Sequence, residues 1–165
     1  MMALDRRKFL KNTGATMLGA AVTVKAANKP APAEKARSRR GKRVILTDQA
    51  PKPGGPYSQA IVAGSTIYVS GQTHINPRTG NVVVGAFEEQ AVLVFENLQA
   101  VLKAAGVGLQ NAVKVNIYLA DLSNFSKLNE VYRRYFSAGD FPARTTVGAQ
   151  LASGLAMEVD CIAVR

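Results

Sequence analysis

Few side chains in this 165-residue sequence are suited to chemistry, and the clearest are an arginine and two carboxylates near the C-terminus. Arg144 follows Pro142, which restricts the chain just before a β-branched run. Glu158 and Asp160 are two residues apart, so on a strand their carboxylates share one face. A guanidinium can hold a carboxylate through two parallel hydrogen bonds, and a carboxylate can take a proton from water. From spacing alone, the favoured interpretation remains a salt-bridging Arg144 and a solvated strand face for Glu158.

The single histidine and the single cysteine argue against several other chemistries. His74 and Cys161 have no further ligands at the spacing of a zinc site, and one cysteine forms no intrachain disulfide. A Ser-His-Asp triad would need His74 as its base, but Ser70-Gly71 lacks the Gly-x-Ser-x-Gly elbow. We expect His74 to be an ordinary surface or pocket residue. Cys161 is expected to be inert in the core, since its strand face also carries Met157, Val159 and Ala163. The sequence has no phosphate loop and no dinucleotide fingerprint.

The net charge of +10 is confined to the N-terminal quarter of the chain. Residues 1–43 hold twelve Lys or Arg against Asp5 and Glu34, whereas residues 44–165 hold nine basic and nine acidic residues. A nucleic-acid-binding domain is expected to carry a basic stripe on its folded part. The charge distribution therefore predicts no nucleic acid as the main partner.

The N-terminal residues have the order of an export signal. Arg6 and Arg7 precede Phe9, and the uncharged, Gly- and Ala-rich stretch 13–24 is followed by small residues up to Ala26. The paired arginines resemble the bacterial twin-arginine signal. The apolar stretch is about twelve residues long, against about twenty for a membrane span, so no stable membrane anchor is expected. We predict a signal peptide over 1–26, a flexible basic linker over 27–43 and a domain over 44–165, in an exported, periplasmic protein. The alternative is a disordered basic tail on a cytoplasmic protein.

Hydrophobic periodicity predicts six strands and two helices in the domain. The helices are expected over 87–105, ended by Gly106, and over 123–136, capped by Ser123. In the second helix the residues expected to face inward are Phe125, Leu128, Tyr132 and either Tyr135 or Phe136. The strands are expected over 43–47, 58–63, 66–70, 113–119, 145–150 and 156–164.

This order predicts an α+β fold with one uncovered sheet face. Two helices cannot cover both faces of six strands, so they should lie on one face. Self-association is the simplest way to cover the other face.

Five short sequence blocks follow one another in the domain. They are Gly55-Pro56-Tyr57-Ser58-Gln59-Ala60, Val69-Ser70-Gly71-Gln72, Asn129-Glu130-Val131-Tyr132, Pro142-Ala143-Arg144-Thr145-Thr146-Val147 and Met157-Glu158-Val159-Asp160-Cys161-Ile162-Ala163. Together they resemble the Rid (YjgF-like) family of enamine/imine deaminases, and the resemblance extends from about Val44 to Arg165.

The resemblance implies a chorismate-mutase-like fold, a homotrimer and a ligand pocket in each cleft between subunits. It also implies a 2-iminobutanoate/2-iminopropanoate deaminase-type hydrolase, which adds water to a 2-imino acid and needs no cofactor or metal. By position, Arg144 matches the carboxylate-binding arginine and Glu158 the acid that directs water. The positions matching other substrate-binding residues are Tyr57, Ser70, Gly71, Asn129 and Thr146, the last standing where several members have cysteine.

Two departures and two alternatives accompany the resemblance. The segment between Arg144 and Glu158 is about one residue shorter than is usual in the family, and Ala152-Ser153-Gly154 replaces a Pro-containing turn, so Asp160 competes with Glu158 for the acid position. The same pocket would also suit a non-catalytic ligand-binding or protein-protecting trimer. The resemblance also allows ribonuclease activity, against which the neutral domain argues.

Overall fold

The computed structural model describes residues 41–136, 139–152 and 154–165. The predicted signal peptide, 1–26, and the predicted linker as far as residue 40 lie outside the described residues. Strand β1 begins at Lys42, so the last two residues assigned to the linker belong to the sheet.

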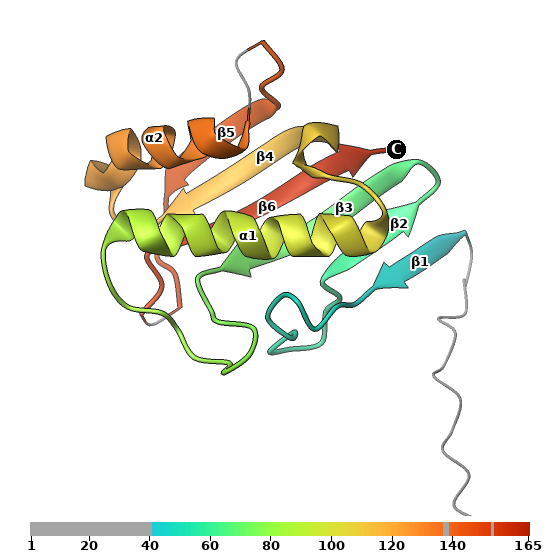
Figure 1. Cartoon of the computed structure of the whole chain (residues 1–165), viewed down its shortest axis with the longest axis horizontal. Coiled ribbons are helices and arrows are strands. Elements are labelled where there is room, and N and C mark those ends of the chain that lie inside the picture. Colours follow the sequence, from blue (N-terminus) through green and yellow to red (C-terminus); the bar gives the residue numbers. More distant parts are fainter. Residues whose placement is uncertain (1–40, 137–138, 153) are drawn as a thin grey trace, which may run out of the picture. The chain divides into compact units, whose positions relative to one another are not determined.

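Six strands form one mixed sheet, and two helices cover one of its faces (Figure 1). The strand order is β1-β2-β3-β6-β4-β5, in which only β4 and β5 pair in parallel. This arrangement confirms the predicted fold class. The strands are β1 (Lys42–Ile45), β2 (Ala60–Ala63), β3 (Thr66–Thr73), β4 (Ala112–Leu119), β5 (Ala143–Gly148) and β6 (Met157–Val164), and the helices are α1 (Phe87–Ala105) and α2 (Phe125–Tyr135).

Helix α1 has the bounds that the periodicity predicts. Its buried residues recur every three or four positions, and Gly106 ends it in the left-handed conformation with φ of 91°. Glu88 in the first turn and Lys103 in the last have the signs that the helix dipole favours. Within the described part of the chain, no helix is both long and apolar enough to cross a membrane.

Helix α2 begins later than predicted, and its cap is a different residue. A 3₁₀ turn over Leu122–Asn124 precedes it, and the Asp121 carboxylate accepts hydrogen bonds from Ser123 N and Oγ at 2.8 and 2.7 Å. Asp121, not Ser123, is therefore the side chain that satisfies the backbone there. Leu128, Tyr132 and Phe136 are buried as expected, but Phe125 is 41% exposed, so its predicted inward position is wrong.

The strands alternate between a core face under the helices and an open face. On β6 the residues Met157, Val159 and Cys161 are buried, whereas the intervening Glu158 and Asp160 are partly exposed. The β3–β6 pairing shifts register between Val69 and Gln72, so β3 contains one extra residue at Ser70-Gly71. Such a bulge twists a strand and re-aims nearby side chains. It lies beside the carboxylates of β6.

Candidate functional site

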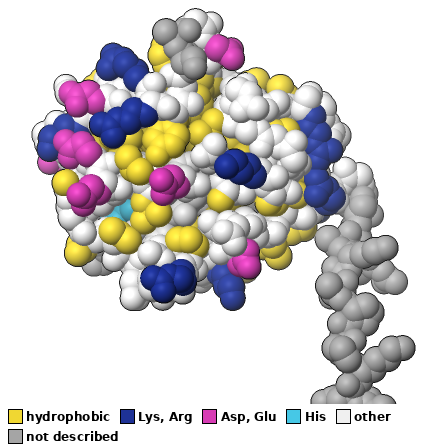
Figure 2. Space-filling view, viewed as in Figure 1, with side chains coloured by type: hydrophobic (Ala, Val, Ile, Leu, Met, Phe, Trp, Pro, Cys, Tyr) yellow, Lys and Arg dark blue, Asp and Glu magenta, His cyan; other side chains and the backbone are white. Residues whose placement is uncertain are grey.

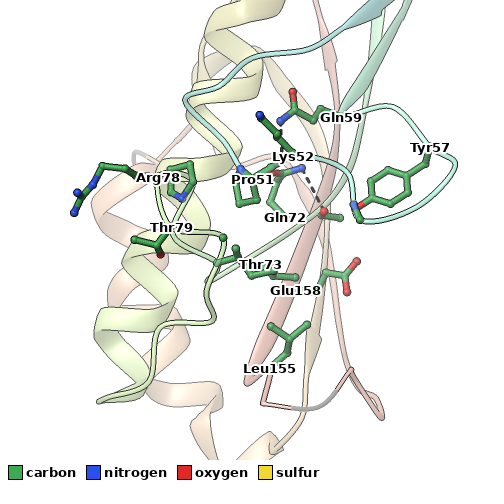
Figure 3. Close-up of a pocket in the computed structure, with 15 residues that line it drawn as sticks. Pro51, Lys52, Tyr57, Gln59, Gln72, Thr73, Arg78, Thr79, Leu155 and Glu158 are labelled. Carbon is green, nitrogen blue, oxygen red and sulfur yellow. Dashed lines mark hydrogen bonds between the residues drawn. The ribbon is translucent and has the colours of Figure 1, made fainter.

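A cavity of about 550 Å³ opens where β3 ends and β6 begins (Figure 3). Gln72 and Thr73 from β3 and Glu158 from β6 form one wall. The loop containing Lys52 and Tyr57 and the turn over 77–80 form the others. Among the described residues, Glu158 has the only acidic side chain that lines this cavity.

Glu158 occupies space that Gly71 leaves free. A Cβ atom added to Gly71 would overlap the Glu158 carboxyl group, so any side chain at this position would push that carboxyl group out of its place. The carboxyl group is partly buried, and this burial, followed by the negative charge of Asp160, raises the pKa of Glu158 above its usual 4.5. A carboxyl with a raised pKa can exchange its proton closer to neutral pH.

Gln59 holds the loop that forms one wall of this cavity. Its side chain is 1% exposed, and Nε2 donates to the carbonyls of Thr47, Ala50 and Pro51 at 3.0, 3.2 and 2.8 Å. Its Oε1 accepts from Thr47 N. One buried amide therefore meets four backbone groups, with two of the three carbonyls sharing one N–H, and fixes the approach to Tyr57. This role follows from contacts distant in sequence, and the motif alone did not reveal it.

His74 is fully buried, so the prediction of a surface or pocket residue is wrong. Nδ1 lies 2.8 Å from Val83 O, and Ala156 N donates to Nε2 at 2.8 Å. The ring is therefore neutral, with its proton on Nδ1. It joins the end of β3 to the turn before β6, and Asn97 Nδ2 fixes the same region through the carbonyls of Thr73 and Ile75 at 2.9 Å each.

A second hollow, of about 270 Å³, surrounds Arg144. Arg144 is on β5, and its Nη2 donates to Asn129 Oδ1 on α2 at 2.8 Å. Its Cζ lies 4.6 Å from the centre of the Tyr132 ring and 5.7 Å from that of Phe125. The amide and the rings hold the guanidinium without neutralising it. Within the described residues the one ion pair joins Lys127 and Glu88, so no carboxylate pairs with Arg144 there.

Tyr132 is the centre of an aromatic cluster under this guanidinium. Its ring stacks on Phe136 at 4.4 Å and meets Phe95 edge-on at 5.8 Å. The hydroxyl is buried and has no hydrogen-bond partner among the described residues, and burial raises its pKa to about 12. Tyr132 therefore contributes its ring and not its hydroxyl, and the sequence motif gave no sign of this role.

The remaining predicted substrate-binding residues have different places. Tyr57 and Gly71 line the Glu158 cavity, and Asn129 lines the Arg144 hollow. Ser70 lines neither, because its Oγ donates to Ser58 O at 2.7 Å. Thr146 also lines neither, and its Oγ1 is buried without a partner in the described part of the chain.

The two hollows lie on opposite faces of the sheet. Arg144 pairs with Val115 on β4, and Glu158 pairs with Tyr118 on the same strand. Val115 and Tyr118 are three residues apart, so they point to opposite faces, and paired residues on neighbouring strands point to the same one. Arg144 therefore lies on the helix-covered face and Glu158 on the open face.

Cys161 is unsuited to nucleophilic chemistry, as predicted. It is 1% exposed, and burial raises its pKa to about 12. Over residues 41–136, 139–152 and 154–165, no three His, Cys, Asp or Glu side chains gather where they could hold a metal ion. Figure 2 shows Lys and Arg side chains interspersed with Asp and Glu on the helix-covered face. The view shows no continuous basic stripe of the kind that follows a nucleic-acid backbone.

The fold and the two hollows define a small α+β protein with one polar hollow on each face of its single sheet. The model of a protein family described as Endoribonuclease L-PSP matches residues 47–165. A RutC family protein from Pyrococcus horikoshii is 45% identical over 125 residues, which are 75% of this chain and 98% of that protein. The Homo sapiens 2-iminobutanoate/2-iminopropanoate deaminase is 41% identical over 125 residues, covering 75% and 90% of the two chains.

Several solved structures are similar to this chain in both fold and sequence. An endoribonuclease-like protein from Thermotoga maritima has a TM-score of 0.72 at 45% identity, with 74% of this chain and 97% of that chain covered. E. coli TdcF with bound serine has a TM-score of 0.70 at 34% identity, with 74% and 98% covered. The chain belongs to the Rid (YjgF/L-PSP) family, which confirms the family resemblance of the five sequence blocks.

Proposed function

We propose that this protein hydrolyses 2-imino acids, and their enamine tautomers, to 2-oxo acids and ammonia. The observation that carries the proposal is the state of Arg144, a cation held on an aromatic ring beside a hollow and paired with no carboxylate in the described part of the chain. A planar guanidinium with free donors is suited to binding the substrate carboxylate. The naming of several relatives as 2-iminobutanoate/2-iminopropanoate deaminases supports this substrate class.

Glu158 supplies the proton transfers in the proposed reaction. Its ionised carboxylate accepts a proton as a water oxygen bonds to the imine carbon, and the electron pair of the C=N double bond moves to nitrogen. The same carboxyl group then returns the proton to nitrogen. Glu158 next takes the proton of the hydroxyl group and delivers it to the same nitrogen, so that the C–N bond breaks with its electron pair on nitrogen, ammonia leaves, and the hydroxyl oxygen becomes the new carbonyl. The raised pKa of Glu158 suits a group that must act in both directions.

The proposed site joins two copies of the chain. Arg144 and Glu158 are on opposite faces of the sheet, so one protomer does not bring both to the same substrate. The open face exposes large apolar side chains, including Tyr68 at 50% and Val147 at 42%. Burying this face in a homotrimer would remove apolar surface from water and place Glu158 of one subunit against Arg144 of the next.

The direct test generates imines in situ with an amino-acid oxidase and follows their disappearance with the full-length protein. Arg144→Ala is expected to lower kcat/KM at least about tenfold, because a charge-assisted contact to the substrate is lost. Arg134→Ala, which removes an exposed arginine on the same side of the molecule, is the matched control and should match the unmodified protein. Equal rates for Arg144→Ala and Arg134→Ala would refute the proposed role of Arg144.

The same experiment separates hydrolysis from binding alone. A trimer that binds small 2-oxo or amino acids through Arg144 but does not shorten the lifetime of imines would be the non-catalytic ligand-binding protein.

Export is tested independently with a fusion of residues 1–43 to a reporter that is active only outside the cytoplasm. Replacement of Arg6 and Arg7 by Lys should abolish export of this fusion, and a reporter that stays cytoplasmic with both arginines intact would exclude the signal peptide.

A further inference from the structure

Asp160 lies beside Glu158 on the open face, and the proposed reaction gives it no part. Its Oδ1 accepts a 2.8 Å hydrogen bond from Asn116 Nδ2, and its Oδ2 accepts a 3.1 Å hydrogen bond from the Tyr118 hydroxyl. Both donors are on β4, where Asn116 pairs with Asp160 and Tyr118 with Glu158. Two hydrogen bonds from a neighbouring strand fix the Asp160 carboxylate in place.

The two donors hold Asp160 without neutralising it. An amide and a phenol are uncharged, and the described residues include no ion pair with Asp160. Residues two apart on a strand are about 6.6 Å apart along it and share a face, so the Asp160 carboxylate is the next side chain along that face from Glu158. Glu158 is thereby placed between a cavity on one side and a like charge on the other.

Within one protomer the other charges near Glu158 are directed elsewhere or lie at the cavity rim. In the proposed trimer Arg144 of the next subunit also faces Glu158, and the carboxylate of the bound substrate pairs with that guanidinium. Lys114 on β4 donates a 2.6 Å hydrogen bond to a threonine hydroxyl on β5. Lys52 belongs to the loop wall, and the Arg78 guanidinium extends away from Glu158 in Figure 3. Burial and the charge of Asp160, in that order, raise the pKa of Glu158, whereas Tyr118 stays uncharged because burial and the two carboxylates raise its own pKa.

We propose that Asp160 is a positioning residue of the imine-hydrolysis site: its anchored negative charge sets the proton affinity of Glu158, so that one carboxyl group takes the proton from water and returns it to nitrogen. This inference rests on the proposed function. An ordinary glutamate is a weak base at neutral pH. Proton transfer is most efficient when the pKa of the catalytic group lies near the working pH. The charge of Asp160, held by Asn116 and Tyr118, shifts the proton affinity of Glu158 in that direction without touching the substrate.

The test compares pH profiles of kcat/KM for Asp160→Asn and Asp160→Glu in the full-length protein. Asp160→Asn keeps the size of the side chain but removes its charge. The limb of the pH profile that follows ionisation of Glu158 should therefore move about half a pH unit or more toward acid. Asp160→Glu restores the charge and should return the limb to within about 0.2 unit of its original place. Glu96→Gln removes an equal charge from the exposed side of α1 and should leave the limb unmoved.

A second measurement does not depend on turnover. The side-chain carboxyl carbon of Glu158, labelled with ¹³C, can be titrated by NMR in the same full-length variants and assigned with Glu158→Gln. A lower Glu158 pKa in Asp160→Asn, with recovery in Asp160→Glu, supports the proposal. An unchanged Glu158 titration in Asp160→Asn would overturn it, whereas absent hydrolysis by the unmodified protein would overturn the proposed function alone.

Discussion

Arg144 and Glu158 project from opposite faces of one sheet, because their pairing partners on β4, Val115 and Tyr118, are three residues apart. A single protomer therefore does not bring the proposed carboxylate receptor and the proposed proton carrier to one substrate. The geometry accounts for the two separate hollows, of which one is lined by Tyr57, Gly71 and Glu158 and the other by Asn129 and Arg144. It also makes the assembly of the proposed site open to a direct genetic test.

Mixed assemblies of two inactive variants should recover activity. Arg144→Ala supplies an intact Glu158, and Glu158→Gln supplies an intact Arg144. In a cyclic trimer formed from equal amounts of both, each cleft has about a one-in-four chance of containing both intact residues, so about one quarter of the activity should return. The measurement is imine hydrolysis after co-expression of differently tagged chains and purification through both tags in turn, which enriches the mixed trimers further.

The control for this experiment is the pair of separately purified variants mixed without subunit exchange, which should remain inactive. Co-expressed trimers that contain both chains yet stay inactive would contradict a site shared between subunits.

Gly71→Ala should disable Glu158 by displacing its carboxyl group. The added Cβ overlaps the carboxyl group and forces it out of the cavity wall. Because general acid–base catalysis contributes about 10²- to 10⁴-fold, kcat should fall by a large part of that factor. Measured in a Glu158→Gln background, the same substitution should cause little further loss, since the two changes act on one group. Additive losses in the double variant would show that Gly71 matters for another reason.

Tyr132 offers a test of how Arg144 is held. Tyr132→Leu removes the ring under the guanidinium, and loss of about 0.5–2 kcal/mol of cation–π attraction should raise KM several-fold more than it lowers kcat. Tyr132→Phe is the matched control, because it keeps the ring and removes only a buried hydroxyl without a partner among the described residues. It should keep KM and raise the stability of the protein slightly. Equal KM values for the Leu and Phe variants would exclude the role of the ring.

The strands and helices were predictable because their residues repeat with regular periods. The core positions of α1 and the alternating residues of β4 and β6 are fixed by local chemistry, and a periodic pattern reports them directly. The start of α2 was placed wrongly because Asp121 and Ser123 can both cap a helix, and only the backbone path decides which does.

The site was predictable only where a motif marked it. Arg144 and Glu158 stand in blocks that resemble the family. The role of Gln59 depends on loop carbonyls 8 to 12 residues away, and that of His74 on a partner 82 residues away. No sequence period records such contacts. A lone histidine or glutamine also carries no sign of whether its polar atoms will meet backbone groups or water. The face on which each residue lies likewise required the strand register, which spacing within one segment does not provide.

Glu158→Gln should make the folded protein more stable at neutral pH while abolishing hydrolysis. Because the pKa of Glu158 is raised from 4.5 in the folded protein, ionisation of this group opposes folding at pH values above 4.5. Below that pH the carboxyl is neutral in both states and the penalty disappears. Thermal unfolding at one fixed protein concentration should therefore show a Tm advantage for Glu158→Gln near pH 8 that vanishes near pH 4. An advantage of the same size at both pH values would point to packing rather than ionisation.

His74→Leu should destabilise the fold and loosen the cavity wall together. The leucine fills much of the same space but leaves Val83 O without its donor and Ala156 N without its acceptor, at a cost of about 1–3 kcal/mol for each unmet group. Ala156 lies two residues before Glu158. The loss should therefore also appear as faster amide hydrogen exchange in two segments, around Val83 and from Ala156 to Glu158. Val84→Ala, at a side chain that is 81% exposed in the same loop, is the control and should change the free energy of unfolding by less than about 0.5 kcal/mol. A His74→Leu protein as stable as Val84→Ala, with unchanged exchange, would show that the two backbone groups find other partners and that His74 does not fix this wall.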